Sequence, residues 1–251
     1  MSESYRALCT DFYVNMKLGL KLDLPRKREE VLEMFERVRR QYPAMRQFRK
    51  YPEELALESD PVDASQQWIG IRSDSVRAGA INPAAASDAY DLHRHALETA
   101  PFYLGVSPLD VDHIELLYGF DLMAEGNHDA IVFDALLSGS ALADALNIDG
   151  ADRIECQPIV GFLLADSDQT EATFEVRTRG RHPHRDGRAE EVPAEPISVY
   201  LTLRRYGPVE SVDRLPGMLT SMSRRGEALC DERVVPRLVV PLRDAIGSGS
   251  A

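Results

Sequence analysis

A strict alternation of apolar and polar residues occurs twice in this chain and constrains its fold more than any other feature. The apolar positions of the first occurrence are Met16, Leu18, Leu20, Leu22 and Leu24. Those of the second, which Leu117 interrupts once, are Ile114, Leu116, Tyr118, Phe120 and Leu122. Alternation with a period of two predicts a strand with one buried and one polar face. Each occurrence therefore predicts a strand of an antiparallel or mixed sheet.

Helical patterns follow both of these strands. After Pro25, a favoured residue in a first helical turn, apolar residues recur at helical spacing as far as Tyr42, and Pro43 ends the pattern. A second helix is expected at about 84–99 and a third at about 128–146. The last helix is expected at about 213–245, with interruptions at Gly226, Pro236 and Pro241.

Shorter alternating or apolar runs predict further strands, at 54–58, 67–72, 154–165, 171–179 and 197–205. The order strand, helix, strands, helix then occurs twice. We therefore expect an α+β fold made of two similar modules, with an antiparallel or mixed sheet and helices on one face. The first module would span residues 1–105. The second, with longer strands and a C-terminal helix, would span 106–246, and 247–251 would form a flexible tail.

The two predicted modules also share a few residues at an offset of 98 positions. Asp23-Leu24 corresponds to Asp121-Leu122, and Phe35-Glu36 corresponds to Phe133-Asp134. An offset of this length suits a duplicated small domain. The element order resembles that of TATA-binding-protein-like and helix-grip modules. This is a resemblance of topology over most of the chain, and it implies no function.

Composition and charge restrict the functions open to this chain. Its 251 residues carry a formal net charge of −12, which repels nucleic-acid backbones and anionic lipids at long range. Its three cysteines form no CxxC pair, so we expect neither a zinc site nor a disulfide framework. No signal-peptide pattern or long apolar run is found, so we expect a cytoplasmic protein that does not span a membrane.

The segment Glu125–Asp129 is the densest polar cluster between apolar elements. His128 and Asp129 at a helix start could form a general-base pair or line a small-molecule pocket. The same residues also suit a purely structural role, in which Gly126 makes a turn, Asn127 caps the helix and Asp129 complements the helix dipole. The structural role is the expectation, and the pair remain weak catalytic candidates.

A second candidate is an arginine-rich segment from Arg177 to Arg188. Arg181, His182, His184 and Arg185 concentrate positive charge in an acidic protein, and Pro183 and Gly187 indicate a loop. The four residues are candidates for binding a partner, either an acidic protein or a phosphate-rich one such as a nucleic acid. The glutamates that follow could instead neutralise a simple solvated loop.

Other patterns exclude specific chemistry. His93 and His95 stand two residues apart, so on a helix they face nearly opposite sides and cannot ligate one metal, and we expect them to be exposed or partly buried. No dinucleotide or phosphate-loop glycine motif is present. We therefore expect no cofactor, no metal and no catalytic constellation. The chain is expected to be a non-enzymatic module that binds a protein partner or itself.

Overall fold

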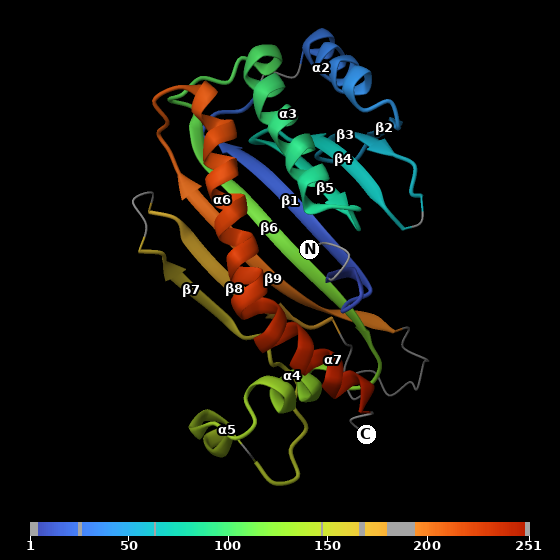
Figure 1. Cartoon of the computed structure of the whole chain (residues 1–251), viewed down its shortest axis with the longest axis vertical. Helices are drawn as coiled ribbons and strands as arrows, with labels where there is room; N and C mark the ends of the chain where they lie inside the picture. The colour runs from blue at the N-terminus through green and yellow to red at the C-terminus, as the bar shows by residue number, and fades with distance from the viewer. Residues whose placement is uncertain are drawn as a thin grey trace.

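The fold is built on one open antiparallel sheet of nine strands in the order β2-β3-β4-β5-β1-β6-β9-β8-β7 (Figure 1). It is seen in a computed structural model that describes residues 5–24, 27–62, 64–146, 148–165, 169–179 and 194–248. The strands are β1 (Asp11–Leu20), β2 (Met45–Lys50), β3 (Leu55–Ser59), β4 (Gln66–Ile71), β5 (Ser75–Ile81), β6 (Val111–Ala124), β7 (Ile159–Leu163), β8 (Glu171–Arg177) and β9 (Glu195–Tyr206). The main helices are α2 (Arg28–Gln41), α3 (Ala86–Leu104), α4 (His128–Leu136), α5 (Ala141–Leu146), α6 (Leu215–Leu229) and α7 (Val240–Gly247). The chain is therefore an α+β protein, as expected.

The two alternating segments become the central strands β1 and β6, which pair in antiparallel register, with Met16 opposite Leu116. The first of these strands was predicted a few residues too far toward the C-terminus. The alternation continues backwards through Val14 and Phe12, and the ladder ends at Leu20, where the register shifts. Beyond that point Leu22 lies outside β1 and is 69% exposed.

Helices α3 and α6 cross the same face of the sheet (Figure 1). The hydroxyl of Tyr118 on β6 lies 2.8 Å from that of Tyr90 on α3 and donates to the carbonyl of Ser223 on α6 at 3.2 Å. Gly226 permits this approach, since a Cβ there would lie 2.3 Å from the Tyr118 ring. Burial raises the pKa of both tyrosines, so they act as neutral hydrogen-bonding groups that join sheet and helices.

The opposite face of the sheet carries polar and charged side chains at the alternate positions. On β6 and β9, Glu115 accepts from the Nε and Nη2 atoms of Arg204. Toward β2, Glu54 binds both Arg72 at 2.7 Å and Arg77 at 3.0 Å. One face is thus buried beneath helices and the other is polar, which is the pattern that strict alternation predicts.

Two strands, β2 and β5, were not predicted, and some predicted elements have different bounds. The inward positions of β5 are Val76 and two alanines, too small to give a clear alternation, yet α3 buries them. The helix predicted at 128–146 is divided into α4 and α5 at Gly139, whose φ of +77° cannot continue a helix. The strand predicted at 154–165 is the shorter β7, because Pro158 precedes it and the pairing with β8 ends at Leu163.

The C-terminal helical region continues through the residues that were expected to interrupt it. Gly226 lies inside α6, and Pro236 lies in a π-helical segment, Cys230–Val239, that connects α6 to α7. Pro241 lies in the first turn of α7, which continues directly from this π-helical segment. Among the described residues, no helix has both the length and the apolar character needed to cross a membrane.

We expect Leu116→Ala to lower the free energy of unfolding by about 2–5 kcal/mol, because Leu116 is fully buried at the centre of the β1–β6 pair. Its neighbour Leu117 points to the polar face and is only half-buried, so Leu117→Ala should cost about 1 kcal/mol or less. Urea unfolding followed by circular dichroism measures both. Equal losses would contradict this assignment of faces.

Candidate functional site

The start of α4 holds the two candidate residues His128 and Asp129, and both are buried. Asn127 caps this helix as predicted, because its side-chain oxygen accepts from the backbone N–H groups of Asp129 at 3.1 Å and Ala130 at 3.0 Å. The capping geometry follows directly from the local sequence Gly126-Asn127 after the end of β6.

The carboxylate of Asp129 connects three segments of the chain. Its Oδ1 atom accepts from the backbone N–H of Cys156 at 2.7 Å and from the hydroxyl of Thr178 at 2.8 Å. These donors come from the segment before β7 and from the end of β8. A carboxylate held by two such donors positions the chain around the start of α4.

The imidazole of His128 is directed to a different partner. Its Nε2–H donates to the carbonyl of Ala124 at the end of β6, at 3.0 Å. The structure therefore places His128 and Asp129 next to each other in the helix, but it does not join their polar atoms. Both make contacts that secure the connection from β6 to α4.

The arginine-rich candidates Arg181, His182, His184 and Arg185 lie outside the described residues. Two arginines that precede them are described. Arg177 binds Glu175 at 2.6 Å, and Arg179 donates to the hydroxyl of Tyr200 at 3.1 Å. The partner-binding hypothesis for the loop thus remains a prediction.

His93 and His95 occupy opposite sides of α3, as their spacing predicts. The expectation that both would be exposed or partly buried is wrong for His93, which α3 buries completely against the sheet. This burial lowers the pKa of the His93 imidazole to about 3. His95 is half-buried, and burial lowers its pKa as well, with a smaller contribution from Arg37.

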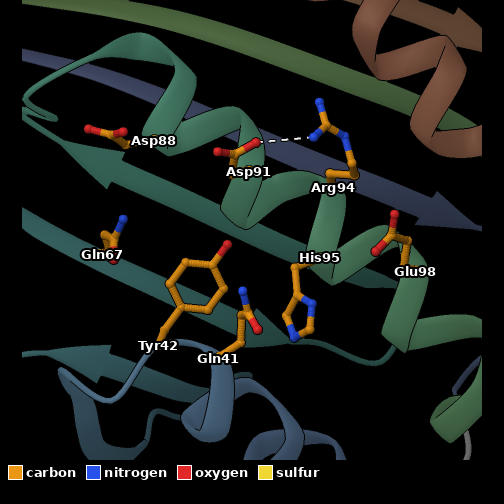
Figure 2. A pocket seen from close by; sticks show the side chains of 8 residues that line it. All are labelled: Gln41, Tyr42, Gln67, Asp88, Asp91, Arg94, His95 and Glu98. Atoms are coloured by element: carbon orange, nitrogen blue, oxygen red, sulfur yellow. Dashed lines mark hydrogen bonds and ion pairs between the residues drawn. The ribbon is translucent and has the colours of Figure 1, made fainter.

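His95 lines a polar cavity of about 500 Å³ between α2, α3 and β4 (Figure 2). Its ring lies 5.7 Å from that of Tyr42, centroid to centroid. The lining residues from α2 and its C-terminal end, from β4 and from α3 are Gln41, Tyr42, Gln67, Asp88, Asp91, Arg94, His95 and Glu98. The cavity therefore combines amide, phenol, imidazole and carboxylate groups.

Two of the carboxylates in this cavity already have intramolecular partners. Asp88 accepts from the backbone N–H of Ala85 at 3.0 Å and so caps α3, and Asp91 binds Arg94 at 3.1 Å (Figure 2). Glu98 and the ring of His95 complete the polar wall. The cavity is open to solvent and offers hydrogen-bonding groups, and of its three lining carboxylates Asp91 is neutralised by Arg94.

The most exposed apolar element is β7, which lies at one edge of the sheet (Figure 1). Its four large side chains are exposed on both faces of the strand: Ile159 63%, Val160 52%, Phe162 52% and Leu163 69%. None of its five residues is charged. The connection from α5 to β7 adds Ile148 and Ile154, both exposed. An apolar edge that no described element covers is a ready template for another strand.

The other edge strand, β2, has a contrasting composition. Three of its six residues are cationic, namely Arg46, Arg49 and Lys50. Charged side chains on an edge strand discourage pairing with another chain. Within the predicted strand 154–165, the uninterrupted apolar run Ile159–Leu164 is typical of a strand buried on both faces. This chain leaves that strand exposed.

Comparisons with known proteins add no further assignment. No protein-family model matches this chain, and no curated protein matches it either. In the part of the chain that the structure describes, no three His, Cys, Asp or Glu side chains gather as the ligands of a metal ion would.

We expect Asp129→Asn to lower the free energy of unfolding by about 1–3 kcal/mol, since a neutral amide binds the Cys156 N–H and the Thr178 hydroxyl less strongly than a carboxylate does. Asp134→Asn on the same helix is the matched control. That carboxylate is largely exposed and lies 3.9 Å from Arg153, so its loss should change stability by about 0.5 kcal/mol or less. Chemical denaturation of both variants tests this, and a silent Asp129→Asn would contradict the structural role.

The burial of His93 predicts a specific pH dependence. The folded-state pKa of about 3 lies below the unfolded value of about 6.5, so the contribution of the neutral ring is complete above pH 6.5 and is lost as the pH falls toward 3. Between pH 7 and pH 5 the wild type should lose about 2 kcal/mol more stability than His93→Leu. Urea unfolding at the two pH values measures this, and parallel losses would show that His93 is not buried as a neutral ring.

Proposed function

We propose that this chain is a cytoplasmic, non-enzymatic protein-interaction module whose binding surface is the edge strand β7. The observation that carries the proposal is the exposure of both faces of an uncharged apolar strand at the edge of a nine-stranded sheet. An edge strand of this kind binds by β-strand addition, in which backbone hydrogen bonds supply affinity and the alternate side chains supply specificity.

The arrangement of the polar groups supports binding at β7 over chemistry elsewhere. Asp129 and His128 make structural hydrogen bonds, and Asp88 and Asp91 in the cavity have partners within α3 or at its start. The apolar side chains of β7, by contrast, make few contacts with the rest of the described chain. Their exposure to water is unfavourable by roughly 25 cal/mol per Å² of apolar surface, and a partner strand would relieve it.

We also infer that residues 1–105 and 106–246 are two related modules, of the topology that resembles TATA-binding-protein-like and helix-grip modules. The strand order supports this inference. On one side of the β1–β6 pair the order is β2-β3-β4-β5-β1, and on the other it is β6-β9-β8-β7. Each half begins with a central strand and has a helix, α3 or α6, after its last strand.

Site-specific photo-crosslinking tests the binding surface. With p-benzoylphenylalanine in place of Leu163, illumination of the producing cells should give covalent adducts with a protein, because this position is on the exposed edge. The same group in place of Phe102 on α3 is the control, since Phe102 is 80% exposed but lies far along the chain from β7.

A second variant links the adduct to strand addition. Gly161→Pro in the Leu163 crosslinking chain should abolish the adduct, because proline removes a backbone donor from the middle of β7. Equal crosslinking at Leu163 and Phe102, or an adduct that persists in the Gly161→Pro variant, would contradict the proposal.

A further inference from the structure

The hydrogen bonds at the ends of β7 determine which of its backbone groups face outward. The N–H of Val176 donates to the carbonyl of Pro158 at 2.9 Å, and the N–H of Leu164 donates to that of Thr170 at 2.9 Å. Because hydrogen-bonded pairs alternate along an antiparallel ladder, the even-numbered residues of β7 bind β8. Ile159, Gly161 and Leu163 therefore direct their N–H and C=O groups to the free edge.

We propose that the occupant of this edge is a second copy of the same chain, paired β7 to β7 in antiparallel register about a twofold axis at Gly161. The inference rests on the proposed role of β7 as the binding edge. In this register Ile159 lies opposite Leu163 of the second copy, and Gly161 lies opposite its own equivalent. Three hydrogen-bonded pairs would contribute about six backbone hydrogen bonds and join two sheets into one.

The side chains of β7 complement themselves in this register. On one face Ile159 meets Leu163 of the second copy, with the small Gly161 at the axis between the two bulky pairs. On the other face Val160 meets Phe162 of the second copy. Cross-strand pairs of aliphatic and aromatic residues stabilise a sheet, and every pair here is apolar.

The charge of β7 itself does not oppose the pairing of two copies, although each copy has a net charge of −12. The strand itself has no charge, so no like charges face each other across the seam. The nearest carboxylates that lie within a strand are those of Glu171 and Glu175 on β8, and Glu175 is bound by Arg177. Across the seam these glutamates would be about 14 Å from those of the second copy, three strand spacings, which exceeds the Debye length of about 8 Å.

The available area indicates a reversible dimer. Pairing through one five-residue strand would bury less than the roughly 1,200 Å² at which standard interfaces begin, and such small interfaces are typical of weak complexes. Exposed apolar residues that precede β7, such as Ile148 and Ile154, could enlarge the interface. We therefore expect a monomer–dimer equilibrium in the micromolar range.

Sedimentation velocity of the full chain from about 1 to about 200 μM tests the proposal. The wild type should shift from monomer to dimer. Gly161→Pro should remain a monomer with unchanged circular dichroism, because the N–H that it loses faces the free edge and not β8. Gly161→Ala is the matched control: it keeps the N–H, its Cβ would meet only Thr173 Oγ1 at 3.8 Å, and it should dimerise like the wild type.

The register can be tested by a cysteine at the axis. Gly161→Cys should form an intermolecular disulfide on mild oxidation, because the two Cα atoms would lie about 5.5 Å apart. Gly217→Cys on α6, where a Cβ would meet nothing within 4 Å, should not form this dimer. Equal crosslinking of the two variants, or none in either, would overturn the Gly161 axis.

The outcomes separate this inference from the proposed function. A wild-type chain that stays monomeric at the highest concentration, or a Gly161→Pro variant that still dimerises, overturns the pairing of two copies. If the Leu163 photo-adduct then contains a different protein, β7 remains a binding edge and only its occupant is wrong. If no adduct forms at Leu163, the binding edge itself is wrong.

Discussion

The antiparallel pairing of β1 with β6 is the contact on which the rest of the fold depends. It joins residues about 100 positions apart in register along most of β1, from Asp11 opposite Asp121 to Gly19 opposite His113. The other strands then pair outward from this central pair, with β5, β4, β3 and β2 beside β1 and β9, β8 and β7 beside β6. Because side chains alternate, this one register decides which residues of both strands face the helices. A shift by one residue would turn one of the two strands over, so that either Lys17 would be buried in place of Met16 or Glu115 in place of Leu116.

The helices are secured to this central pair by polar as well as apolar contacts. Tyr118 connects β6 to both α3 and α6, and Tyr5 near the N-terminus donates to Asp231 in the π-helical segment. At the far end of β6, His128 and Asp129 secure α4 and the segments around it. Hydrogen bonds between buried groups of different elements favour one arrangement of those elements. These polar groups therefore have structural roles.

The two edges of the sheet differ in the charge and the exposure of their side chains. An open sheet presents unpaired backbone groups at both ends, and proteins usually protect them. On β2 this protection is given by three cationic side chains. On β7 neither charge nor a covering described element is present, and its large side chains are more than half exposed. This contrast within one sheet is the basis for the proposal that β7, and not β2, receives another strand.

The sequence by itself determined the α+β class, the two central strands, most of the helices and the Asn127 cap, because these follow from local periodicity and capping chemistry. Only the tertiary structure decided the rest. Small residues such as Ala78 become core because α3 covers them, and His93 becomes buried for the same reason. The cavity joins Gln41, Gln67 and His95, which no local pattern relates. The apolar run of β7 would be expected in a core, and its place at an edge depends on pairing with β8 alone, a long-range choice that local sequence does not encode.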